Sequence, residues 1–316
     1  MIGDMQKWTP NVAGIIEHAR EIHPKTEIIS RLVSGEIHRS NYEKVCIRSR
    51  KLASALEKDG VKKGDVIATL ALNTYRHLEM YYGISGMGAI THTLNFRLHP
   101  EQAVYIINHA EDKIIFVELP FVPILEGLQE NLKTVEKYVV LCEVDEMPET
   151  TLKNAISYEE YIQDGDENYS WPTLEDDAAC ALCYTSGTTG NPKGVLYSHK
   201  SNVIHAQAAL TAMTIKPDDT ILMVVPLFHV LAWGIPYFGP MNGLKLVMPG
   251  MQMEGEPLFE LIDQEDVTLA FGVPTIWMGL LAYCRDNNKI LSSVKNTIIG
   301  GSALSLATLQ EIDEVH

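Results

Sequence analysis

Residues 184–195 read Tyr-Thr-Ser-Gly-Thr-Thr-Gly-Asn-Pro-Lys-Gly-Val, and they follow an apolar run at residues 178–183. From Thr185 onward the segment holds four hydroxyl side chains, three glycines and one lysine. Glycine lets backbone N–H groups turn toward an anion, the hydroxyls add donors, and Lys193 adds positive charge. An apolar strand that runs into such a turn predicts a phosphate-binding loop.

The type of phosphate loop follows from the spacing. A Walker A loop needs glycines five residues apart followed by Lys and Ser or Thr, but the residue five after Gly187 is Pro192. A surface linker would need neither the apolar strand nor the Pro-Lys-Gly that follows. Along its whole length the segment resembles the signature loop of the adenylate-forming enzymes, which include acyl-CoA synthetases, luciferases and peptide-synthetase adenylation domains. An unrelated P-loop ATPase stays an alternative, and it would release ADP rather than AMP.

Composition narrows the class of protein further. The chain has 316 residues, of which 46% are hydrophobic, so it can bury a substantial core. Its formal net charge of −16 argues against nucleic acid or an anionic membrane as a partner. No apolar run approaches the roughly 20 residues that cross a bilayer, and the first ten residues lack a signal-peptide pattern. Together with five scattered cysteines, these features predict a cytoplasmic protein with reduced thiols.

Apolar strand-like runs alternate with amphipathic helical stretches, which predicts an α/β fold with doubly wound, mostly parallel sheets and flanking helices. In the first half, helices are expected at about 41–60 and 76–86 and from residue 100, and strands at 66–70, 90–94, 114–117 and 138–141. In the second half, strands are expected at 179–183, 221–225, 244–248, 269–272 and 297–299. Acidic residues crowd into 143–178, so this segment is expected to be a surface connection between halves at 1–142 and 179–316.

A second stretch with chemical potential is Pro226-Leu227-Phe228-His229-Val230-Leu231-Ala232-Trp233-Gly234. A His and a Trp four apart on the first turn of a helix would project to one side, toward the crevice that the loop faces. From the residues alone, a structural His and a core Trp are the more common outcome. The stretch is similar to fatty acyl-CoA synthetases, however. That resemblance implies that His229 acts beside the acyl carboxylate, that Val230 also contacts substrate, and that Trp233 gates the acyl tunnel.

The third element is Ile298-Ile299-Gly300-Gly301-Ser302-Ala303. Small residues leave room for a flat ring such as adenine against the backbone, although a tight strand-to-helix turn would have the same composition. The family resemblance implies that Gly301, Ser302 and Ala303 border the nucleotide and that Gly300 borders the acyl pocket.

The same resemblance assigns the phosphate loop. It implies that Thr185 reaches Mg²⁺, and that the β- and γ-phosphates are held by Ser186, Gly187, Thr188, Thr189, Gly190 and Lys193. The implied cofactors and cosubstrates are ATP, Mg²⁺ and coenzyme A, and the implied partners are these small molecules and a fatty acid. A homodimer is also plausible, because close relatives in the family form dimers.

The resemblance covers residues 53–303, and blocks such as 66–70, 108–112 and 248–250 look like medium- and long-chain fatty acyl-CoA ligases. Family members continue for about another domain, so the chain is expected to be an incomplete N-terminal adenylate-forming domain of two similar subdomains, without the C-terminal lid. The intact enzyme would convert a fatty acid to acyl-adenylate and then to acyl-CoA, whereas the chain alone would turn over poorly or not at all. An aryl- or short-chain acyl-CoA ligase, or a non-catalytic nucleotide-binding fragment, are the alternatives.

Overall fold

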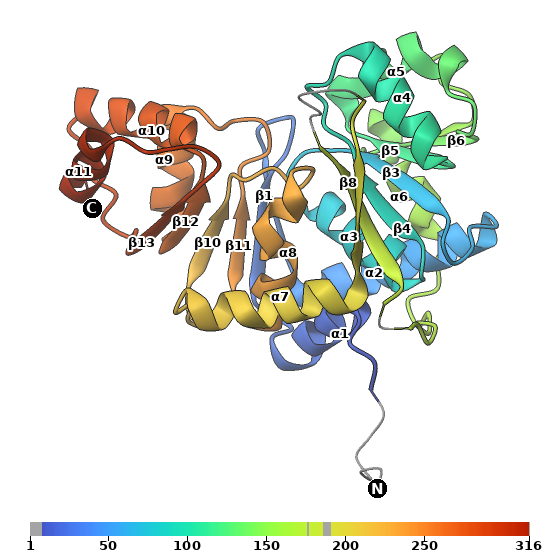
Figure 1. Cartoon of the computed structure of the whole chain (residues 1–316), viewed down its shortest axis with the longest axis horizontal. Coiled ribbons are helices and arrows are strands. Elements are labelled where there is room, and N and C mark those ends of the chain that lie inside the picture. The colour runs from blue at the N-terminus through green and yellow to red at the C-terminus, as the bar shows by residue number, and fades with distance from the viewer. Residues whose placement is uncertain (1–7, 176, 186–190, 316) are drawn as a thin grey trace, which may run out of the picture.

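A computed structural model describes residues 8–175, 177–185 and 191–315. Two sheets stand side by side with helices between them and on their outer faces (Figure 1). The first sheet has, in spatial order, β7 (Ala155–Ser157), β6 (Lys137–Val140), β5 (Ile114–Val117), β3 (Val66–Leu70), β4 (Ile90–Thr93), β8 (Ala179–Tyr184) and β9 (Gly194–Ser198). The second has β13 (Asn296–Ile299), β12 (Leu269–Gly272), β10 (Thr220–Met223), β11 (Lys245–Met248), β1 (Glu27–Arg31) and β2 (Ile37–Asn41).

Among these pairs only β8/β9 and β1/β2 are antiparallel, and each of these hairpins forms one edge of its sheet. All other described neighbours run parallel. The prediction of a doubly wound, mostly parallel α/β fold with two similar subdomains is therefore confirmed.

Helices cover both faces of each sheet. The layer between the sheets is built from α1 (Val12–Ile22), the start of α2 (Tyr42–Lys58), α3 (Tyr75–Gly86), α7 (His199–Ala212) and α8 (Ile235–Met241). The outer faces are covered by α4 (Pro100–Ala110) and α5 (Val122–Leu128) on the first sheet, and by α9 (Gly255–Gln264) and α10 (Pro274–Asp286) on the second. The remaining helices are α6 (Tyr158–Gln163), which packs beside α2 and α3, and α11 (Leu306–Val315), which packs on α10. Short 3₁₀ turns lie at Leu119–Phe121, Gln129–Asn131, Val144–Glu146 and Val230–Gly234.

The central helical layer gives the two sheets one common core. Buried side chains from both sheets meet there, for example Ile28 and Phe271 from the second sheet and Cys183 from the first. Tyr81 of α3 is buried in the same cluster. Removal of this much apolar surface from water is what holds the two sheets against each other.

Several elements follow directly from local sequence signals. The Asn41 side chain accepts a hydrogen bond from the Lys44 N–H at 2.9 Å and so caps α2. Pro100 occupies the first turn of α4, where its missing N–H costs nothing. These helices and β5 lie where the sequence predicts them, while β6 begins one residue earlier than expected.

The sheets do not follow the expected halves of the chain. β1 and β2 come from the first half but join the second sheet, where Ile28 pairs with Leu246 of β11. In exchange, β8 and β9 join the first sheet, where Leu182 pairs with His92 of β4. The two sheets therefore do not coincide with the expected halves 1–142 and 179–316. An apolar run predicts a strand but carries no information about its distant partner.

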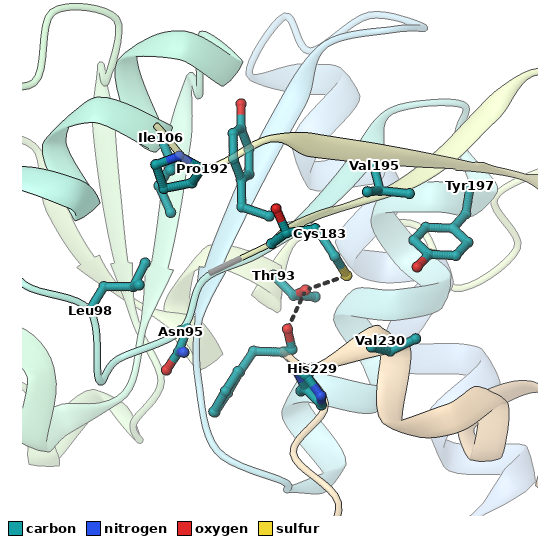
Figure 2. A pocket seen from close by; sticks show the side chains of 13 residues that line it. Thr93, Asn95, Leu98, Ile106, Cys183, Pro192, Val195, Tyr197, His229 and Val230 are labelled. Atoms are coloured by element: carbon teal, nitrogen blue, oxygen red, sulfur yellow. Dashed lines mark hydrogen bonds between the residues drawn. The ribbon is translucent and has the colours of Figure 1, made fainter. Parts of the chain in front are cut away.

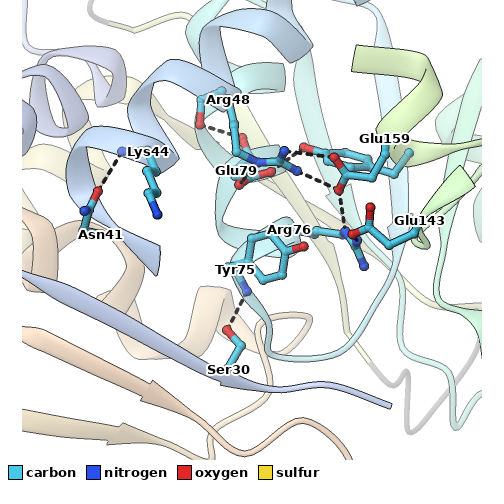
Figure 3. Close-up of polar contacts among 11 residues, drawn as sticks. Ser30, Asn41, Lys44, Arg48, Tyr75, Arg76, Glu79, Glu143 and Glu159 are labelled. Atoms are coloured by element: carbon cyan, nitrogen blue, oxygen red, sulfur yellow. Dashed lines mark hydrogen bonds and ion pairs between the residues drawn. The ribbon is translucent and has the colours of Figure 1, made fainter. Parts of the chain in front are cut away.

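The acidic segment 143–178 is more than a surface connection, because it supplies β7 and α6 to the first subdomain. Its carboxylates pair with arginines, as Figure 3 shows. Arg48 binds both oxygens of Glu159 at 2.8 and 2.9 Å and binds Glu79 at 2.6 Å. Arg76 binds Glu159 at 3.0 Å and Glu143 at 2.5 Å. The negative charge of this segment is thus balanced by arginines that are distant in the sequence, so the sequence of the segment alone does not predict these ion pairs.

Candidate functional site

A cavity of about 220 Å³ opens where β4 and β8 end (Figure 2). Open α/β sheets bind ligands at the carboxyl ends of their parallel strands, which is where this cavity lies. Its lining comes from the ends of these strands, α4 and the loop that precedes it, the residues around the predicted phosphate loop and the segment that follows β10. The lining residues are Thr93, Asn95, Leu98, Ile106, Cys183, Tyr184, Thr185, Pro192, Val195, Tyr197, Phe228, His229 and Val230.

A buried amide links the two sheets to each other. Asn73 follows β3, and its Nδ2 donates to the carbonyl oxygens of Met223 at 2.7 Å and Val225 at 2.8 Å, at the end of β10. Its Oδ1 accepts from the Leu227 N–H at 2.8 Å. Asn73 therefore sets where the chain leaves β10 and approaches the cavity.

The described ends of the predicted phosphate loop form the stem of a hairpin. The Thr185 N–H donates to the Lys193 carbonyl oxygen at 3.0 Å, and the Lys193 N–H donates to Thr185 Oγ1 at 3.4 Å. Thr185 lines the cavity, and Lys193 is exposed directly before β9. The other predicted loop residues lie outside the described residues: Ser186, Gly187, Thr188, Thr189 and Gly190.

His229 and Val230 are exposed and line the same cavity as Thr185. The segment before them is tied to the first sheet, because Thr93 Oγ1 donates to the Phe228 carbonyl oxygen at 3.4 Å (Figure 2). Thr93 Oγ1 also lies 3.3 Å from the thiol of Cys183. Two of the three sequence elements therefore meet at one site.

The prediction of a first helical turn across His229 and Trp233 is wrong. Val230, Leu231, Ala232 and Trp233 have φ angles of 46°, 51°, 48° and 55°, so they form a left-handed turn, and α8 starts only at Ile235. Left-handed backbone costs a non-glycine residue about 1–2 kcal/mol, so this turn is held by its surroundings. The two side chains consequently diverge: His229 faces the cavity, whereas Trp233 does not line it.

Trp233 instead contacts the third sequence element. Its ring centroid lies 6.3 Å from that of Phe271, and a Cβ added to Gly300 would lie 3.0 Å from its Cη2 atom. Gly301 has a φ of 88°, a conformation that favours glycine. Ser302 and Ala303 are exposed beyond the end of β13. The small-residue turn thus adjoins Trp233, and its contacts with adenine stay a prediction.

The electrostatic character of the cavity suits an anion. None of the described residues that line it is Asp or Glu, although the whole chain has a net charge of −16. Burial raises the pKa of Tyr184 to about 12 and also raises the pKa of the Cys183 thiol, so both are neutral at pH 7. A phosphate or carboxylate in this cavity meets no carboxylate of the lining.

Sequence reasoning missed four of the polar or aromatic lining residues, namely Thr93, Asn95, Tyr184 and Tyr197. Tyr184 stands immediately before Thr185, and Thr93 ends a predicted strand, so their positions at strand ends were available signals.

Over 8–175, 177–185 and 191–315, no three His, Cys, Asp or Glu side chains are grouped to hold a metal. Mg²⁺ accepts hydroxyl and phosphate oxygens and usually keeps several waters, so the Thr185 hydroxyl fits a nucleotide-bound Mg²⁺ as a single protein ligand. Within the same ranges, no helix combines the length and apolar character that a bilayer span requires.

Comparison with known proteins extends the sequence argument. The family model described as AMP-binding enzyme matches residues 16–316. The chain is 43% identical over 318 residues to the medium-chain-fatty-acid–CoA ligase of Ectopseudomonas oleovorans, and the match covers 100% of this chain and 58% of that protein. It is also 43% identical over 324 residues to the 3-methylmercaptopropionyl-CoA ligase of Ruegeria pomeroyi, covering 100% of this chain and 60% of that one.

The fold has a close counterpart among solved structures. The anthranilate CoA ligase AuaEII in complex with anthranoyl-AMP matches with a TM-score of 0.88 at 22% identity, over 100% of this chain and 60% of that one. At this identity the likeness shows the fold alone. The chain spans between 58% and 60% of the length of the two relatives. Because the family model matches nearly all of its residues, the chain belongs to the AMP-binding enzyme family.

Proposed function

We propose that the protein to which this chain belongs uses ATP to activate a carboxylic acid as an acyl-adenylate and then transfers the acyl group to coenzyme A. The observation that carries the proposal is that Thr185, expected to reach Mg²⁺, and His229, expected beside the acyl carboxylate, line one cavity although they lie far apart in the sequence. Both relatives of 43% identity are CoA ligases, which supports the reaction class. The activity is proposed for the whole protein, because the chain spans only part of the length of these relatives.

The proposed reaction has two displacements. A carboxylate oxygen of the acid attacks the α-phosphorus of ATP, the bond between the α- and β-phosphates breaks, and pyrophosphate leaves. The coenzyme A thiolate then attacks the acyl carbonyl carbon and displaces AMP. In both steps negative charge is concentrated on the oxygens of the reacting groups. The protein therefore accelerates them by aligning the reacting groups and by placing fixed positive potential around them. The described lining of the cavity contains no Asp or Glu that would repel this charge.

The roles of individual residues are part of the proposal. Lys193 and the loop residues hold the β- and γ-phosphates, and bound Mg²⁺, contacted by Thr185, would neutralise part of their charge. An N–H of His229 donates to the acid's carboxylate, which orients the attacking oxygen toward phosphorus. Gly301 and the two residues after it flank the adenine. Trp233 gates the tunnel that receives the acyl chain, and Gly300 borders the acyl pocket.

The substrate that we favour is a medium- or long-chain fatty acid. Leu98, Ile106, Phe228 and Val230 give the cavity apolar walls that can accept methylene groups. One specific observation favours a second candidate, a short thioether acid, because the 3-methylmercaptopropionyl-CoA ligase is as similar to the chain as the medium-chain enzyme is. We further propose that the protein is cytoplasmic and homodimeric.

The test is a pyrophosphate-release assay on the complete protein with acids from acetate to palmitate, together with 3-methylmercaptopropionate and benzoate. We expect AMP and pyrophosphate as products. The rate should be highest with acids of six or more carbons, because each methylene group that the protein buries stabilises the complex by about 0.8 kcal/mol. Lys193→Gln should weaken ATP binding, whereas the exposed Lys153→Gln should serve as a matched control. Release of ADP, or the absence of acid-dependent pyrophosphate, would refute the proposal. The 316-residue chain alone should bind ATP weakly and turn over poorly or not at all.

A further inference from the structure

We propose that Tyr184 is a positioning residue for the phosphate loop, and that His92, His109 and Asp112 hold its ring in place. The inference rests on the proposed function, because it assumes that Lys193 contacts phosphate and that Thr185 contacts the Mg²⁺ bound to it. It adds four residues from the outer face of the first sheet that the proposed chemistry does not use.

Tyr184 is the last residue of β8, so its side chain is carried by the residue that directly precedes Thr185. Its hydroxyl lies 2.6 Å from Nδ1 of His109, a residue in the last turn of α4. The Tyr184 ring also packs at the start of β9, because a Cβ added to Gly194 would lie 3.2 Å from Tyr184 Cζ and 3.4 Å from its Oη atom. A side chain at 194 would therefore push the two strands of the hairpin apart or displace the ring.

A buried pair also contacts the ring. His92 of β4 lies with its ring centroid 5.1 Å from that of Tyr184. Its Nδ1 atom is 2.8 and 3.0 Å from the two carboxylate oxygens of Asp112, and both side chains are fully buried. The other ring nitrogen, Nε2, is buried and has no hydrogen-bond partner among the described residues. Asp112 thus fixes the orientation of the imidazole on which Tyr184 rests.

The two supports come from one place in the fold. His109 lies near the end of α4, and Asp112 follows that helix by two residues. Burial raises the pKa of Asp112, and the hydrogen bond and charge of His92 act against that shift. The end of α4 therefore holds the ring of Tyr184 through one direct and one indirect contact.

Tyr184 is connected to both described ends of the loop through Thr185, which forms two hydrogen bonds with Lys193. Thr185 is covalently next to it, and the Thr185 N–H donates to the Lys193 carbonyl oxygen. The return bond runs from the Lys193 N–H to Thr185 Oγ1. A shift of the Tyr184 ring therefore moves both described ends of the loop, whereas it leaves the turn at Gly300 and Gly301 untouched.

The experiment measures hairpin order and nucleotide affinity separately, in the 316-residue chain. Hydrogen exchange of peptides covering residues 180–197 is followed without ligand, and binding of Mg²⁺·ATP, pyrophosphate and adenosine is measured by calorimetry. The variants are Tyr184→Phe, His109→Ala and His109→Asn, in which the amide group replaces Nδ1. Tyr161→Phe is the matched control, because it removes a 2.9 Å hydroxyl hydrogen bond to Asp59 at a distant site on α6.

Tyr184→Phe and His109→Ala should speed exchange in 180–197 and weaken ATP and pyrophosphate binding by about three- to fivefold, as expected for one lost hydrogen bond, with adenosine affinity unchanged. His109→Asn should restore most of the parent behaviour, and Tyr161→Phe should change neither readout. Unchanged exchange in Tyr184→Phe would overturn the inference, as would faster exchange with unaltered ATP affinity. Failure of the parent chain to bind ATP or pyrophosphate would count against the proposed function instead, and the exchange data would still decide whether Tyr184 is held as described.

Discussion

Replacement of Arg48 by Met should destabilise the protein more than the loss of any exposed ion pair. Arg48 binds Glu79 at 2.6 Å, and the Glu79 side chain is fully buried. Removal of one partner from a buried pair costs about 3–5 kcal/mol, because the remaining charge is left without compensation. Glu159 adds less, since it keeps its 3.0 Å contact with Arg76. We therefore expect Arg48→Met to lower the free energy of unfolding by about 3–5 kcal/mol in urea titrations followed by tryptophan fluorescence.

The deficit of this variant should depend on pH in a defined direction. Burial raises the pKa of Glu79 above its usual value, and Arg48 opposes that shift. A carboxyl group with a raised pKa loses its contribution to stability as the pH rises through that pKa, and removal of Arg48 raises the pKa further. Arg48→Met should therefore be more destabilised at pH 8 than at pH 5, and the added change Glu79→Gln should remove most of this difference.

The control for this experiment is Lys153→Met, which breaks a 2.9 Å ion pair with Glu130 between two largely exposed side chains. Such pairs contribute little, so its unfolding curve should match that of the parent. An Arg48→Met variant no less stable than Lys153→Met, or equally destabilised at pH 5 and pH 8, would refute the argument.

The remaining predictions concern the contacts around the site. Asn73→Ala should lower the free energy of unfolding by about 2–3 kcal/mol, because it leaves two carbonyl oxygens and one N–H without a partner in a buried place; urea titration measures this. Gly300→Val should displace the ring of Trp233, which its Cβ would approach to 3.0 Å, and shift the tryptophan emission maximum. Burial lowers the pKa of His77 to about 4, so the stability that it contributes is lost as pH falls from 6.5 toward 4, and His77→Gln should flatten that part of the melting-temperature profile.

The sequence predicted those elements that are defined by residues within or next to the element itself. The cap at Asn41 and the proline at residue 100 define helix starts without reference to the rest of the chain. The apolar run at 114–117 is buried along its whole length, and it was correctly predicted as a strand. Thr185, His229 and Val230 came together because each follows a predicted strand, and the carboxyl ends of those strands meet.

Other features depend on partners far away in the sequence. The left-handed turn at Val230–Trp233 opposes the preference of each of its residues, so no local rule predicts it. Glu159 looks like part of a solvated acidic segment until Arg48 and Arg76 are known to face it. The position of Tyr184 at a strand end is visible in the sequence, but the support of its ring is not, since the residues that contact the ring lie on β4 and α4.

The exchange of hairpins between the sheets has a consequence for biosynthesis. β1 leaves the ribosome well before its parallel partner, β11, because Ile28 of β1 pairs with Leu246, which is translated much later. During that interval only β2 can satisfy the backbone of β1, and the other edge of the nascent hairpin is free to pair wrongly. The first sheet, in contrast, has all the strands that the structure describes in it once Ser198 is made. Long-range strand pairing is slow and prone to aggregation, so the newly made chain should need a chaperone most while β1 waits for β11.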